Sequence, residues 1–182
     1  MALHFGLPWA PEKESNGGVM ALAELFVEHK ESIRQKTRNL YPKIPADKLG
    51  FAPAEGALTL GQVLRHLWMS EEGSTKIVSK GSWEYFERRI PARLVDILGP
   101  LGTLQQELDN LERVHAQTIA LIRSLPDDAF AKEHVHEKLN LKRTTRSILL
   151  GLGEHEAHHR GQIATYLRIL GDKAPSPYPG FK

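Results

Sequence analysis

The sequence predicts an all-α fold, a four-helix bundle, and three observations support this prediction. Four long segments carry apolar side chains at the alternating steps of three and four residues that mark one face of a helix. Prolines and glycines separate these segments, and no strand-like alternation is long enough to build a sheet. The chain has 182 residues, 41% of them hydrophobic and 25% charged, which suits one domain with a buried core.

The first helix should run from about residue 19 to residue 41, where Pro42 ends it. The second begins after Thr59, because Thr59 and Gln62 match a capping box. The third covers 101–125 with a heptad spacing, and the fourth runs from 143 or 144 to 170. The expected apolar stripe of the first helix consists of Leu22, Phe26, His29, Ile33 and Leu40.

The segments between the helices constrain the topology. The connection over 81–100, with room for a short helix, is long enough to cross the length of the bundle, so the order need not be up-down-up-down. A second connection, before the fourth helix, is expected to be a loop containing His134 and His136. The whole of residues 1–182 is interpreted as a single domain, with an irregular arm at 1–18 and a Pro-rich tail at 172–182.

Composition excludes several classes of protein. No run approaches the roughly 18 to 20 apolar residues of a membrane span, and no secretory leader is evident, so we expect a cytoplasmic protein that does not contact membranes. The net charge is only +2 and the basic residues alternate with acids, which argues against nucleic-acid binding. The absence of cysteine excludes thiolate ligands, so any metal must be bound through nitrogen or oxygen.

The clearest functional motif is the stretch from His155 to His159, which reads His-Glu-Ala-His-His. On a helix, His155 and His159 lie one turn apart on the same face, and a shared metal ion would satisfy both imidazoles in a core. The letters also match the zinc protease signature H-E-x-x-H, but the chain after His159 holds no further His or Glu. A third ligand must therefore lie upstream.

The other histidines are weaker candidates. His66 lies at the edge of the apolar stripe of the second helix, so its position alone leaves ligation and a structural role equally open. His115, in the heptad seam, is interpreted as a buried imidazole bonded to a neighbour, and His158 as a rim residue. His4, His134 and His136 lie in expected loops, where no metal role is predicted, and His29 lies on the first helix without a partner at helical spacing. Gly151 and Gly153 predict a close approach of another backbone or a ligand just before the motif.

These motifs resemble the DinB-like superfamily of metal-binding four-helix bundles. The resemblance covers about 19–171 and rests on two segments, TLGQVLRHL at 59–67 and HEAHHRGQI at 155–163, the second followed by YLRILG at 166–171. It implies one divalent metal ion, zinc or nickel, on His66, His155 and His159. It also implies a low-molecular-weight thiol cosubstrate, similar to bacillithiol, mycothiol or glutathione, and is compatible with a homodimer.

Three hypotheses follow. The first is a metal-dependent enzyme that activates a small thiol or water for attack on a small-molecule electrophile, with Gln162 and Glu156 as residues supporting the site; an ordinary solvent-facing position is the expected one for Glu156. The second is a non-catalytic stress-response or interaction bundle, with or without metal. The third, nucleic-acid binding, is the one that the charge disfavours.

Overall fold

The computed structural model describes residues 21–89 and 92–173. The expected arm at 1–18, and all but the first two residues of the expected tail, lie outside them. Four long helices and two short ones account for most of the described chain: α1 (Leu22–Arg38), α2 (Leu60–Lys80), α3 (Glu84–Arg88), α4 (Leu94–Leu98), α5 (Leu104–Ser124) and α6 (Thr145–Ile169). The two strands are β1 (Glu133–His136) and β2 (Leu141–Thr144), and 3-10 turns occupy Tyr41–Lys43, Ala46–Lys48, Asp127–Ala131 and Glu137–Leu139.

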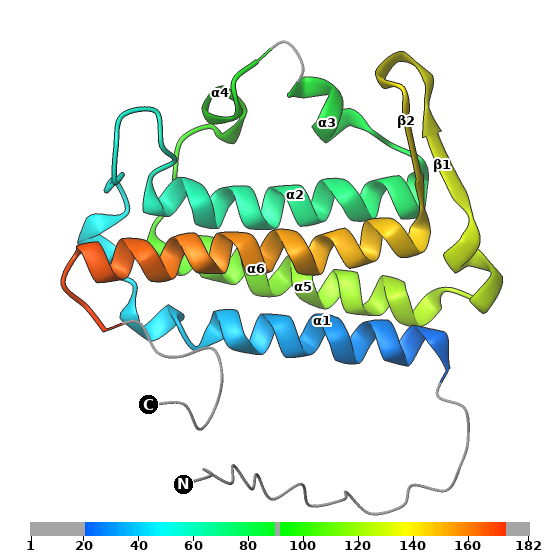
Figure 1. Ribbon diagram of the computed structural model, residues 1–182, viewed down its shortest axis with the longest axis horizontal. Helices are drawn as coiled ribbons and strands as arrows, with labels where there is room; N and C mark the ends of the chain where they lie inside the picture. The colour runs from blue at the N-terminus through cyan, green and yellow to red at the C-terminus, as the bar shows by residue number, and fades with distance from the viewer. Residues whose placement is uncertain (1–20, 90–91, 174–182) are drawn as a thin grey trace, which may run out of the picture.

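The four long helices form the predicted bundle (Figure 1). Each of α1 and α2 contacts both α5 and α6, so α1 and α2 lie diagonally opposite one another. The connection with α3 and α4 returns along α2 to the other end of the bundle, so α5 runs in the same direction as α2 (Figure 1). The long crossover between the second and third long helices is therefore confirmed, and the order is not up-down-up-down.

Helix ends follow from local hydrogen bonds. Thr59 Oγ1 accepts from Gln62 N at 3.2 Å while Gln62 Oε1 accepts from Thr59 N at 2.9 Å, which is the predicted capping box. The same reciprocal pair occurs at Thr103 and Gln106, where α5 begins. These caps fix the start of α2, and hence the position of His66 two turns later.

The core differs from the predicted stripe of α1. Two apolar clusters fill the two ends of the bundle, one around Leu64 and Ile163 and the other around Val27 and Ile122. On α1, the residues that face the centre are Ala23, Val27, Lys30, Arg34 and Thr37. Four members of the expected stripe, Leu22, Phe26, His29 and Ile33, are only half-buried or exposed, and the fifth, Leu40, is buried just beyond the helix. The central layer is charged, so an apolar pattern could not locate it.

The segment expected as a loop with His134 and His136 is instead an antiparallel β-hairpin. Glu133 pairs with Thr144 and His136 pairs with Leu141. The hairpin lies beside the end of α2 and the start of α6 (Figure 1). Within the described ranges, no helix is long and apolar enough to cross a bilayer.

Candidate metal site

Three histidines from two helices converge at one point between α2 and α6. The Nε2 atom of His155 lies 3.0 Å from Nε2 of His66 and 3.1 Å from Nε2 of His159. The i, i+4 spacing on α6 brings His155 and His159 together, and the contact between α2 and α6 adds His66, 89 residues away in the chain. The structure thus brings together all three histidines that were expected as metal ligands.

Hydrogen bonds on the far sides of two rings orient the imidazoles. His159 Nδ1 lies 2.6 Å from Gln162 Oε1, an acceptor, so Nδ1 carries the proton and Nε2 keeps its lone pair. His66 Nδ1 lies 3.0 Å from the hydroxyl of Tyr85, in α3. Such partners fix the ring orientation and leave Nε2 available as a ligand atom.

The environment favours neutral imidazoles. Burial, together with the other two histidines, lowers the pKa of His66 to about 3, and burial with His159 nearby lowers that of His155 to about 4. Burial also lowers the pKa of His159. The Arg89 guanidinium contributes to the lowered pKa at all three, so its positive charge lies within electrostatic range of the cluster. Three uncharged nitrogen lone pairs at neutral pH are what a cation requires.

The spacing of these nitrogens fits a metal ion. Two imidazoles on one tetrahedral ion at about 2.0–2.1 Å place their nitrogens about 3.3 Å apart. The two Nε2 separations of 3.0 and 3.1 Å are close to that value, and the three ligand atoms all lie within 4.8 Å of one another. The residues present therefore fit a divalent metal ion bound by three neutral nitrogen ligands.

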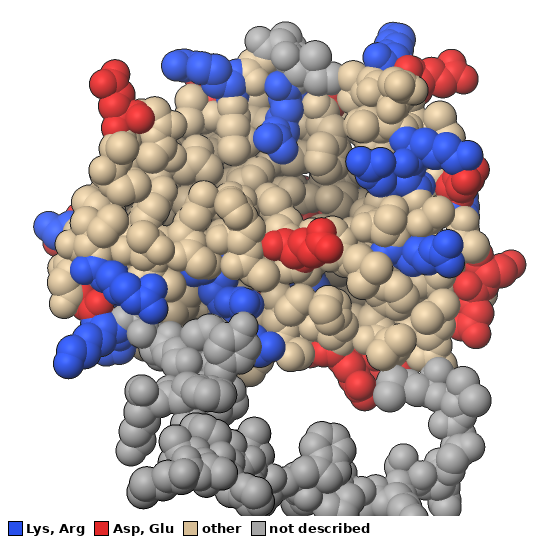
Figure 2. Space-filling view, viewed as in Figure 1, with Lys and Arg blue, Asp and Glu red and all other residues tan. Residues whose placement is uncertain are grey.

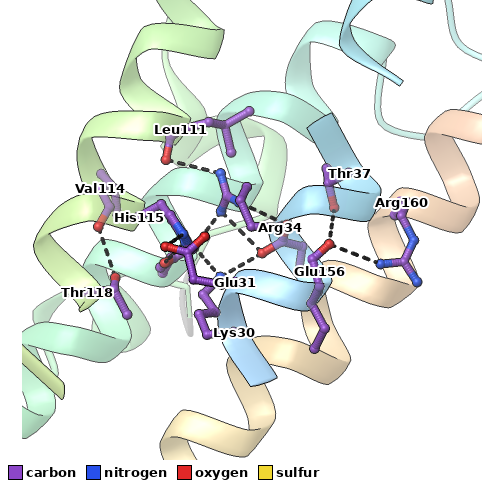
Figure 3. A network of polar contacts seen from close by, with 12 residues as sticks. Lys30, Glu31, Arg34, Thr37, Leu111, Val114, His115, Thr118, Glu156 and Arg160 are labelled. Carbon is purple, nitrogen blue, oxygen red and sulfur yellow. Dashed lines mark hydrogen bonds and ion pairs between the residues drawn. The ribbon is translucent and has the colours of Figure 1, made fainter. Parts of the chain in front are cut away.

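Glu156 is not the solvent-facing residue that was expected. It is only 2% exposed and belongs to a buried ion-pair network between α1, α2 and α6 (Figure 3). Its carboxylate lies 2.6 Å from Lys30 Nζ and 2.9 Å from Arg34 Nε, the latter in a geometry too bent for a hydrogen bond. Glu71 of α2 accepts from the same two cations, at 2.9 and 2.8 Å. Two acids and two bases thus balance one another at the centre of the bundle.

This network gives Glu156 a different chemical environment from that of the three histidines. Burial alone would raise the pKa of Glu156, but Lys30 and Arg34 outweigh burial and hold its pKa at about 2. Arg34 also donates to the carbonyl oxygen of Leu111 at 3.1 Å, which ties the network to α5 (Figure 3). A carboxylate with so low a pKa, held between two cations, is not suited to act as a general base, so the role of Glu156 is in the core of the bundle.

The other described histidines do not belong to the three-nitrogen cluster, although the ring of His158 contacts that of His159, with their centroids 4.8 Å apart. His115 is buried, as expected, and its Nε2 lies 3.2 Å from Glu31 Oε1 (Figure 3), but this contact does not have the geometry of the hydrogen bond that was expected. His158 is exposed, as expected of a rim residue, and contacts Gln162. In the hairpin, His134 bonds to Thr145 and His136 to Glu87. His4 lies outside the described residues.

Of the two helix glycines before the motif, only one meets a neighbour. A Cβ on Gly153 would lie 2.6 Å from Ile33 Cδ1 and 3.0 Å from His29 Nε2, so α6 approaches the side chains of α1 there. A Cβ on Gly151 would meet nothing within 4 Å, and Gly151 lines an open cleft. At Gly153 the close neighbours are therefore side chains of α1, not the backbone or ligand that was expected, and at Gly151 no protein atom comes close.

Sequence reasoning missed Tyr85, because nothing in the connection 81–100 indicates which of its aromatic residues reaches the site. One signal was present. Gly73 lies inside the continuous helix α2, and a Cβ there would lie 2.6 Å from the Cβ of Tyr85. A glycine inside a helix at that position permits the close packing that brings Tyr85 to His66.

Comparisons with known proteins agree with this architecture. Residues 30–163 match the sequence model of the DinB superfamily. The Bacillus subtilis protein YjoA is 24% identical over 154 residues, which cover 84% of this chain and 93% of YjoA.

Three solved structures share the fold. The crystal structure of YjoA, a DinB-like protein, superposes with a TM-score of 0.67 at 22% identity, covering 86% of this chain and 99% of YjoA. A DinB-like protein from Bacillus cereus gives 0.68 at 18%, covering 85% and 97%. YfiT from Bacillus subtilis gives 0.63 at 17%, covering 88% and 94%, and is described as a probable metal-dependent hydrolase with an unusual four-helix bundle topology.

Proposed function

Since the chain belongs to the DinB superfamily, we propose that it is a metal-dependent enzyme with one divalent ion on His66, His155 and His159. Its reaction is the attack of a small nucleophile, water or a low-molecular-weight thiol, on a small electrophile. The observation that carries the proposal is the convergence of three Nε2 atoms on one point, with separations of 3.0 and 3.1 Å. The description of YfiT as a probable metal-dependent hydrolase supports the same class of chemistry.

The donor set supports this chemistry. When bound, a divalent ion on three neutral imidazoles would act as a Lewis acid and lower the pKa of water or a thiol. Zinc and nickel are both compatible with three nitrogen ligands. Bacillithiol, mycothiol and glutathione are the thiols that we propose to test.

The surrounding protein orients the histidine rings and leaves the cluster accessible to a substrate. Tyr85 and Gln162 hold the rings of His66 and His159 from behind. His155 borders an open cleft of about 300 Å³, large enough for a small substrate to reach the cluster. In this proposal Gln162 therefore positions His159 for metal binding.

Metal analysis of the purified protein tests the proposal. After loading with zinc or nickel and dialysis, we expect about one equivalent in the wild type and less than about a tenth in His155→Ala. His29→Ala is the matched control, because His29 is an exposed histidine outside the cluster. Turnover is then measured as consumption of each thiol, or hydrolysis, with a panel of small electrophiles.

The outcomes separate the hypotheses. Less than about a tenth of an equivalent in the loaded wild type would refute the metalloenzyme. A full equivalent with no turnover of any thiol or electrophile in the panel would favour the alternative, a non-catalytic metal-binding bundle. Turnover that is equal in the wild type and His155→Ala would place the reaction elsewhere in the protein.

A further inference from the structure

The cleft beside His155 has a distinct chemical character. It lies between α2, the short helix α3 with its two flanking residues, strand β2 and the first half of α6. Much of its wall is apolar, with hydroxyl groups between the apolar side chains. The apolar residues are Ile77, Trp83, Phe86, Leu141, Ile148 and Leu152, and the hydroxyl-bearing ones are Ser70, Ser74 and Ser147.

Two arginines, Arg89 and Arg143, also line the cleft, and none of its lining residues within the described part of the chain is acidic. Arg143 donates to the carbonyl oxygen of Lys142, and neither arginine forms an ion pair with another residue of 21–89 or 92–173. Lys and Arg side chains lie on both sides of the hollow below α3 and the hairpin, and an acidic side chain lies at its lower edge (Figure 2). Two uncompensated guanidinium groups at one cleft attract anions, and their planar forks match an oxyanion.

We propose that this cleft binds a small organic oxyanion, a carboxylate or a phosphate, with its charged group at Arg89 and Arg143 and its apolar body along Trp83. This assignment of a substrate class rests on the proposed function. The volume of about 300 Å³ limits the ligand to a small molecule. Because His155 borders the same cleft, a ligand bound in this way lies beside the histidine cluster.

Three probes of equal ring size test the assignment: benzoate, phenyl phosphate and the uncharged benzamide. Binding to zinc-loaded protein is followed by the NMR signal of the Trp83 indole N–H, because Trp83 lines the cleft. We expect at least one of the two anions to bind about tenfold more tightly than benzamide, and the better anion identifies the oxyanion. Equal affinity for all three probes would overturn the proposal.

Substitutions of the two arginines test whether their charges bind the anion. Arg89→Gln and Arg143→Gln should each weaken binding of the preferred anion about three- to tenfold and leave benzamide unchanged. Arg168→Gln is the matched control, since Arg168 is an exposed arginine near the opposite end of α6 and does not line the cleft. If both cleft variants keep the anion preference, the arginine site is refuted. Thermal unfolding of each variant verifies that it is folded.

The same titrations on metal-free protein separate this proposal from the proposed function. Preference for the anion that persists without metal, and that needs Arg89 and Arg143, supports the cleft even if metal loading fails. If the preference for the anion over benzamide is lost without metal, and is unchanged in the two arginine variants, the anion binds to the metal ion alone. That result would overturn the cleft assignment and leave the metal site intact.

Discussion

The hydroxyl oxygen of Tyr85 lies 3.0 Å from Nδ1 of His66, which joins α3 to the histidine cluster. Two features of α2 hold Tyr85 in place. Ser70 bonds to the Tyr85 hydroxyl, and Gly73 leaves room for its ring, since a Cβ on Gly73 would approach the Tyr85 Cγ to 2.7 Å. Because Nδ1 of His66 is occupied by this contact, Nε2 faces the other two histidines.

Loss of this hydroxyl should weaken metal binding without abolishing it. Tyr85→Phe keeps the ring packed against Gly73 and removes only the partner of His66 Nδ1. We expect the metal dissociation constant to rise about tenfold, measured by competition with a chromogenic chelator. Tyr41→Phe is the control, because Tyr41 bonds to Glu112, away from the cluster. Equal metal affinity in the wild type and Tyr85→Phe would contradict this role.

Two glycine substitutions in long helices should have opposite consequences. Gly73→Ala forces the rigid base of the Tyr85 ring away and should raise the metal dissociation constant about as much as Tyr85→Phe. Gly151→Ala meets no atom within 4 Å, so we expect unchanged metal affinity and a gain of roughly 0.5–1 kcal/mol in stability from helix propensity. Chelator competition and urea unfolding measure the two effects. A Gly73→Ala variant that binds metal normally would show that Tyr85 does not need this close packing.

Removing one charge from the central ion-pair network should destabilise the protein far more than removing a charge from the surface. Glu156→Gln leaves Lys30 and Arg34, only 3% and 1% exposed, with one carboxylate between them. We expect the free energy of unfolding at pH 7 to fall by about 3–5 kcal/mol, because a partner is removed from buried charges. Glu154→Gln, at an exposed position of the same helix, should change it by less than about 0.5 kcal/mol. Similar losses in both variants would refute the structural importance of the network.

Much of the architecture could be predicted from the sequence, because the relevant signals are local. Helix periodicity, the Thr59 capping box and the length of the connection 81–100 gave the four long helices and the crossover. The two histidines of the cluster on α6 can be predicted for the same reason, because an i, i+4 pair needs only a helix. His66 needed the resemblance to a family, since its position on α2 alone left its role open.

The charged centre could not be predicted in this way. Helical-wheel reasoning locates the buried face by its apolar residues, and here the face of α1 at mid-bundle carries Lys30 and Arg34. The charges on that face are balanced only by Glu71 of α2 and Glu156 of α6. The paired residues are 37 to 126 positions apart in the chain, so no periodic pattern reveals the pairs. For this reason the sequence predicts a solvent-facing Glu156, which is wrong.

The pH dependence of stability follows from the lowered pKa of three largely buried groups, two histidines and one carboxyl group. The pKa of His66 is about 3 and that of His155 about 4, against 6.5 for an ordinary histidine. Between these values and pH 6.5 the unfolded chain binds protons that the folded protein does not, so acid favours unfolding. Glu156, with a pKa of about 2 against 4.5, contributes stability above pH 4.5 and loses it as the pH falls toward 2.

The histidines alone should therefore control stability between pH 6.5 and 5. For metal-free protein we expect the free energy of unfolding to fall by about 1–2 kcal/mol for each of His66 and His155 over this interval, measured by urea unfolding. His155→Ala should show a smaller decrease, because it lacks one of the groups. The difference between the wild type and Glu156→Gln should stay constant over the same interval and shrink only below pH 4.5, since Glu156 titrates in the lower range. A metal-free wild type whose stability does not change from pH 6.5 to 5 would show that the cluster accepts protons in the folded state as readily as free histidine.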